Sequence, residues 1–186
     1  IYGARLGLMR SYFLTDNFES AAQYAQKILS SSQINNTIKL EAHYAQGMAQ
    51  FKQRKFVLSR PSLEWIFKNT TTVMAAESKF TLAQMAFEDS NFVDCDKAIR
   101  ELVKMKPSYN YWVAKGLILQ TRSLMAQNDL FQGEQTLKSV RDHYPKTDDG
   151  ILEEAEALWS ELMAVKNAPK EIVPEPKPII EVNGEK

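Results

Sequence analysis

Apolar residues recur three and four positions apart along almost the whole chain, which is the spacing of one face of an α-helix. The pattern predicts nine helices, at residues 3–15, 18–31, 37–53, 56–68, 73–89, 92–105, 109–127, 130–143 and 149–166. No segment alternates apolar and polar residues for long enough to indicate a strand. We therefore predict an all-α domain at residues 1–167, followed by a proline-rich tail or linker at residues 168–186.

A short block recurs four times where one predicted helix gives way to the next, spanning the turn and the first residues of the second helix, at residues 16–21, 54–59, 90–95 and 128–133. Each block has two polar turn residues, a large apolar residue, two variable residues and a small residue. The large apolar residues lie 38, 36 and 38 positions apart and are Phe18, Phe56, Phe92 and Leu130. A period of this length is typical of stacked helical repeats.

The residues at the end of each block are all small: Ala21, Ser59, Cys95 and Gly133. We expect them to be buried where two helices cross, because a longer side chain would push the helix axes beyond about 8–10 Å. Apolar residues follow four and seven positions later, and all but one of them are large. At four positions they are Ala25, Leu63, Ile99 and Leu137, of which Ala25 is the small one. At seven positions they are Ile28, Ile66, Leu102 and Val140. Pro61 indicates that the helix at 56–68 either begins near Ser59 or kinks.

Four such blocks in register resemble the tetratricopeptide repeat (TPR) family over about residues 3–145. Met9, Gly47, Ala83 and Thr121 fall at its close-packing position in the first helix of each pair, whereas its tryptophan is absent from the usual place. The resemblance implies a right-handed superhelix of antiparallel helical hairpins, a TPR-like α-solenoid. We expect four hairpins plus a C-terminal capping helix, with an apolar stripe from Ile151 to Met163 lying on the last hairpin.

Composition narrows the possible chemistry. Lysine plus arginine balances aspartate plus glutamate at 23 each, which argues against a nucleic-acid binder. No apolar run approaches the 18 residues or so of a membrane span. The single cysteine, Cys95, excludes an internal disulfide, and the two histidines, His43 and His143, have no ligand-spaced partners. We expect no enzyme activity, no metal and no cofactor, and we interpret Cys95 as a packing residue and His43 as a partly exposed surface residue.

The resemblance also implies that the first helices line a concave groove, which in this family takes extended peptides or partner helices. Aromatic residues, methionine and arginine are enriched at protein interfaces. The alternative is that the aromatic residues fill the core between helix layers. The positions carried over from the family are Leu6, Arg10, Phe13, Tyr44, Met48, Phe51, Phe80, Gln84, Phe87, Ile118, Arg122 and Met125.

We predict a non-catalytic scaffold that binds a protein or peptide. The alternative is a purely structural segment of a longer repeat solenoid with no dedicated ligand. Leu6, Leu8 and Met9 near the start favour that alternative, because terminal repeats need polar outer faces. The absence of an initial methionine suggests a piece of a longer polypeptide, and the loose motifs suggest a bacterial periplasmic or cell-envelope protein.

The tail is predicted to be extended, because prolines at 169, 174, 176 and 178 are incompatible with a helix. Its apolar residues, among them Ile172 and Ile179, are possible anchors on a repeat surface of the same or a second copy. Self-association is therefore expected through the tail or through the open N-terminal end.

Overall fold

The computed structural model describes residues 2–168, and all of its regular secondary structure in this range is helical. The helices are α1 (Tyr2–Leu14), α2 (Phe18–Leu29), α3 (Asn36–Lys52), α4 (Phe56–Asn69), α5 (Val73–Glu88), α6 (Phe92–Val103), α7 (Asn110–Ala126), α8 (Leu130–His143) and α9 (Ile151–Asn167). All nine predicted helices are confirmed, and every boundary agrees within two residues. The predictions for the tail fall outside the described residues.

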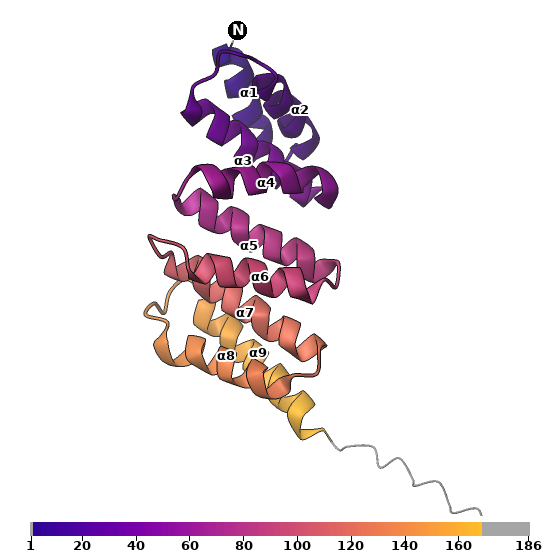
Figure 1. Cartoon of the computed structure of the whole chain (residues 1–186), viewed down its shortest axis with the longest axis vertical. Helices are drawn as coiled ribbons and strands as arrows, with labels where there is room; N and C mark the ends of the chain where they lie inside the picture. Colours follow the sequence, from indigo (N-terminus) through magenta and orange to yellow (C-terminus); the bar gives the residue numbers. More distant parts are fainter. Residues whose placement is uncertain (1, 169–186) are drawn as a thin grey trace, which may run out of the picture.

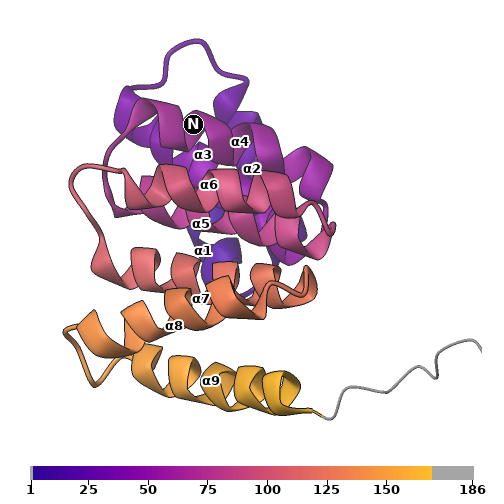
Figure 2. The same ribbon diagram turned by 60° about the horizontal axis from the view of Figure 1, so that its bottom comes forward.

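The helices stack in chain order along one long axis, from α1 at one end to α8 and α9 at the other (Figure 1). Each helix contacts its neighbours in the chain. In addition α1, α3, α5, α7 and α9, here called the odd layer, each contact the next member of that layer. Within residues 2–168 no two members of the even layer, α2, α4, α6 and α8, contact each other. The odd layer is therefore continuous, and the even helices are separated from one another. Figure 2 shows α7, α8 and α9 together at one end of the stack.

The four turns within the helix pairs have the same backbone geometry. Asp16, Arg54, Ser90 and Asn128 all adopt left-handed φ values between 56° and 60°. In three turns the next residue caps the following helix, as Asn17, Asn91 and Asp129 each accept a hydrogen bond from the amide three residues on. Aromatic rings also meet across three turns, in the pairs Phe13–Phe18, Phe51–Phe56 and Phe87–Phe92, with centroids 5.8–6.0 Å apart. The repeat inferred from the sequence is thus a repeat of structure.

The small residues lie where they were predicted, buried between the helices of each pair: Ala21, Ser59, Cys95 and Gly133. The eight apolar residues that follow them at four and seven positions are also buried. Burial, with the nearby charge of Asp96, raises the pKa of the Cys95 thiol to about 12. The thiol is therefore protonated at neutral pH, which agrees with a packing role.

Helix α9 completes the odd layer at the C-terminal end. Ile151, Ala155, Leu158 and Leu162 are buried, the first three in one cluster with Ile118 and residues of α8. Glutamates 153, 156 and 161 lie on its exposed side. The predicted apolar stripe and its position on the last hairpin are confirmed. Helix α4 begins at Phe56 and contains Pro61, so of the two alternatives for this proline the late start near Ser59 is excluded.

Candidate functional site

The histidine in the second repeat packs against the neighbouring helix α4. His43 is half-buried, stacks on Trp65 with ring centroids 4.2 Å apart, and places Nδ1 3.2 Å from Ser62 Oγ. Burial, helped by the positive charge of Lys39, lowers its pKa to about 4. Within residues 2–168 no group of three acidic, histidine or cysteine side chains could hold a metal ion.

We expect His43 to make stability fall as the pH is lowered from about 6.5 to about 4. In this window an unfolded chain binds a proton at His43, because the ordinary pKa is 6.5, whereas the folded chain does not. The contribution is complete above pH 6.5 and is lost as the pH passes through 4. Urea unfolding at several pH values should show a smaller pH dependence for His43→Asn than for the wild type.

The exposed His143 provides the matched control. The free energy of unfolding of His143→Asn should depend on pH much as that of the wild type does, and more closely so than that of His43→Asn. Equal dependence in all three proteins would contradict a neutral, packed His43.

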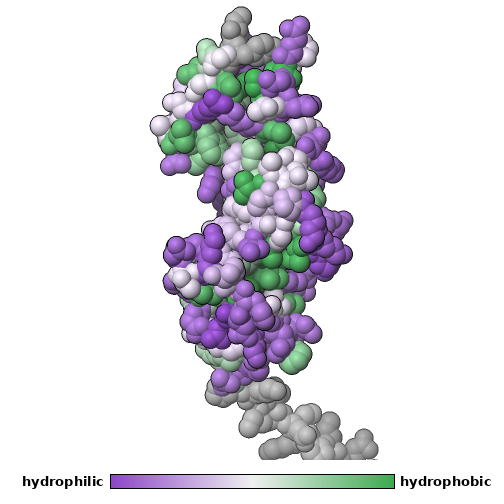
Figure 3. Space-filling view, turned by 90° about the vertical axis from the view of Figure 1, so that its left-hand side faces the viewer, coloured by the Kyte–Doolittle hydropathy of each residue, from purple (hydrophilic) through white to green (hydrophobic). Residues whose placement is uncertain are grey.

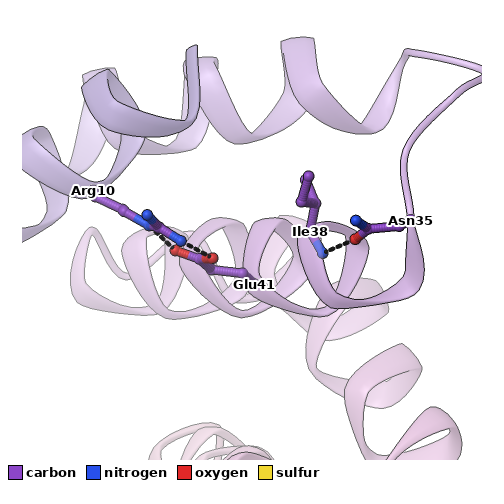
Figure 4. Close-up of polar contacts among 4 residues, drawn as sticks. All are labelled: Arg10, Asn35, Ile38 and Glu41. Atoms are coloured by element: carbon purple, nitrogen blue, oxygen red, sulfur yellow. Dashed lines mark hydrogen bonds and ion pairs between the residues drawn. The ribbon is translucent and has the colours of Figure 1, made fainter. Parts of the chain in front are cut away.

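Within residues 2–168, polar side-chain contacts link consecutive odd helices at three of the four steps, and each contact includes a residue of one register position. The Arg10 guanidinium of α1 donates hydrogen bonds to both carboxylate oxygens of Glu41 in α3 (Figure 4). The Tyr44 hydroxyl of α3 donates to Glu77 of α5 at 2.8 Å, and Lys115 of α7 contacts Glu154 of α9 at 2.6 Å. The residues at 41, 77, 115 and 154 are spaced by 36, 38 and 39 positions, close to the repeat. These four residues are Glu, Glu, Lys and Glu. Helix α7 therefore has a lysine where the other odd helices of the series have a glutamate, and it has no carboxylate there to pair with α5.

A hollow of about 260 Å³ lies at this interrupted step. The hollow is lined by five of the groove positions that the family resemblance implied: Phe80, Gln84, Phe87, Ile118 and Arg122. Leu119 and the charged residues Glu88, Lys115 and Glu154 complete the lining. Figure 3 shows one side of the molecule, where apolar groups form several separate patches among hydrophilic ones.

The charges around the hollow do not balance. Lys115 and Arg122 share the single carboxylate of Glu154, with Arg122 Nη2 3.8 Å from it and so beyond hydrogen-bonding distance. Glu88 is paired at 2.7 Å with Arg54 from the neighbouring turn. The lining itself has two cations and two carboxylates, and a positive charge is in excess by one once Arg54 is counted beside its partner Glu88. The half-buried Arg122 lines the hollow together with two phenylalanines.

The remaining groove residues have other partners. Met48 is only 7% exposed, so it belongs to the core and not to an accessible groove; Ile118, although it lines the hollow, is also buried. Arg10 is held by Glu41, and Tyr44 by Glu77. Three more pack inside the protein, Phe13 and Phe51 across the turns and Met125 against the cluster beneath α9. At Phe13 and Phe51 the aromatic ring thus packs against the turn of its own repeat.

Sequence reasoning did not identify Lys115, Glu154 or Glu88. A signal for Lys115 was present, because it lies 38 positions after Glu77, where the earlier repeats have glutamate. Glu154 had no such signal, since no turn block follows α8 to set the register of α9.

No protein-family model, no curated protein and no solved structure matches the chain. No helix among residues 2–168 is long and apolar enough to cross a membrane.

Proposed function

We propose that the chain is a TPR-like α-solenoid, a right-handed superhelix of helical hairpins, that binds a protein or peptide and has no catalytic role. Two observations support this architecture. The four turns share one geometry, and among residues 2–168 contacts between alternate helices occur only in the odd layer. The odd helices touch one another, whereas the even helices are further apart. The stack therefore curves, with the odd layer on its inner side. The concave face is then the odd layer, which contains the hollow.

The hollow supports a ligand in which a large apolar side chain lies next to a carboxylate. Phe80 and Phe87 offer apolar surface, and Arg122 offers several donors in a planar arrangement that matches a carboxylate. The observation that carries this proposal is that two cations, Lys115 and Arg122, share the one carboxylate of Glu154. An extended segment with an aspartate or glutamate beside an aliphatic or aromatic residue has the required chemistry.

Selection from a random peptide library on the immobilised full chain tests this proposal. Enriched peptides should carry a carboxylate next to a large apolar residue. Their affinity, measured by fluorescence anisotropy, should fall about tenfold or more for Arg122→Gln, because a hydrogen bond to a charged group contributes about 1.5–3 kcal/mol. Phe80→Ala should also weaken binding.

Lys97→Gln is the matched control, since Lys97 is an exposed cation of the even layer. It should bind the selected peptides as the wild type does. Peptides that bind equally well to Arg122→Gln, or a selection that enriches no common sequence, would contradict the proposal.

A further inference from the structure

Four members of the odd layer use the same face to receive the even helix that precedes them in the chain. The face consists of four register positions, occupied in α3 by Ala42, Ala45, Gln46 and Ala49. The counterparts are 78, 81, 82 and 85 in α5, 116, 119, 120 and 123 in α7, and 155, 158, 159 and 162 in α9. All sixteen are buried except Gln120 and Trp159, which are half-buried.

The packing at these faces follows one pattern. Ala42 and Ala45 lie against Ala25 and Ile28 of α2, and Leu158 lies against Leu137 of α8. A Cβ atom on Gly116 would meet Leu102 Cδ2 at 3.2 Å and Ile99 Cγ2 at 3.5 Å, both from α6. At these faces the first position holds a small residue, such as Ala42 or Gly116, and apolar residues of the even helix pack against it.

Helix α1 presents the same four positions with no helix against them. They are Ala4, Gly7, Leu8 and Ser11, and all four are exposed, Leu8 by 39%. A Cβ atom on Gly7 would have nothing within 4 Å. Helix α1 lies at the end of the stack (Figure 1), so no other described helix covers this face.

The composition of this face resembles that of the covered faces and differs from that of a polar cap. The first of the four positions holds a small residue in every odd helix: Ala4, Ala42, Ser78, Gly116 and Ala155. No charged residue lies at the four positions in α1. Its two arginines have partners elsewhere in the chain, Arg5 in the carbonyl of Lys27 and Arg10 in the carboxylate of Glu41. A terminal repeat that ends an array needs a polar outer face, and this face is not one.

We infer that the face of α1 formed by Ala4, Gly7, Leu8 and Ser11 is a docking site for one amphipathic helix of a partner. The four covered faces define the chemistry of that helix. It has a small residue followed four and seven positions later by large apolar ones, as in Cys95, Ile99 and Leu102 of α6. A second copy of the chain is a poor occupant, because the apolar stripes of α2, α4, α6 and α8 are already buried in the same molecule.

A labelled peptide with the sequence of residues 90–105 is the probe for this inference. Cys95→Ala prevents its oxidation, and a hydrocarbon link between positions 93 and 97, both exposed in the protein, holds it helical. Fluorescence anisotropy should show binding to the full 186-residue chain. Ile99→Glu in the peptide, or Leu8→Glu in the protein, should weaken binding at least about tenfold, since each buries an unpaired charge in the contact.

Val57→Glu is the control in the protein, because Val57 is 85% exposed and lies on α4, away from this face. It should bind the probe as the wild type does. Circular dichroism should show that Leu8→Glu folds normally. The inference is overturned if the probe binds no better than its Ile99→Glu version or binds Leu8→Glu unchanged. Sedimentation showing a dimer that Leu8→Glu dissolves would also overturn it, in favour of a second copy.

Discussion

Replacing Leu63 with alanine is expected to lower the free energy of unfolding by about 3–4 kcal/mol. Leu63 is fully buried at the contact of α3, α4 and α5, in one cluster with Met48, Leu82 and Met85. Truncation removes apolar contacts with two flanking helices and leaves a cavity, because both neighbours are also held by other helices, α3 by α2 and α5 by α6. Urea denaturation followed by circular dichroism measures the loss.

Leu58→Ala, in the same helix, is the matched control. Leu58 is 58% exposed, so its truncation should change the free energy of unfolding by no more than about 0.5 kcal/mol. Similar losses for the two variants would mean that α4 does not present Leu63 to the core.

The same site accounts for Gly47, and a double-mutant cycle isolates the reason. A Cβ atom on Gly47 would lie 2.7 Å from Leu63 Cδ2, so we expect Gly47→Ala to destabilise the protein although alanine favours helices by about 1 kcal/mol. In the Leu63→Ala background the obstruction is removed, and the same change should become neutral or stabilising. An equal cost in both backgrounds would show that close helix approach does not require the glycine.

The helices and turns could be predicted from the sequence because both depend on local signals. Helix boundaries follow from apolar spacing and from short polar caps such as Asn17 and Asn91. The burial of Ser59 and Cys95 followed from the register of the repeated blocks, which the left-handed turn residues confirm.

The accessibility of the site residues could not be predicted in the same way. Arg10 and Met48 both matched groove positions, but one is held by a glutamate 31 residues away and the other is covered by α5. Such outcomes depend on which side chain the next helix brings, and not on the residue itself. The hollow likewise depends on Lys115 pairing with Glu154, 39 positions further along. A period of 38, 36 and 38 residues does not fix that pairing.

Deleting α9 is expected to have the largest effect of all. A chain that ends at residue 148 loses Ile151, Ala155, Leu158 and Leu162, which are all at most 1% exposed. Burial of large apolar side chains contributes about 1.5–3 kcal/mol each, so the loss should amount to about 5 kcal/mol or more and take much of the stability of a domain of this size. The deletion also uncovers apolar residues of α7 and α8, among them Ile118 and Leu137.

Two measurements on the shortened chain test this expectation, the melting temperature and the association state by sedimentation. The melting temperature should fall markedly, and the fragment should self-associate, because the uncovered face has no polar helix to shield it from water. A chain ending at Ala168 is the control, since it keeps every described helix. Leu158→Glu in the full chain should reproduce the destabilisation without removing any backbone, because it places a charge at a fully buried position. The expectation is contradicted if the fragment ending at residue 148 stays monomeric and has the same melting temperature as the control. Helix α9 would then not stabilise the last hairpin.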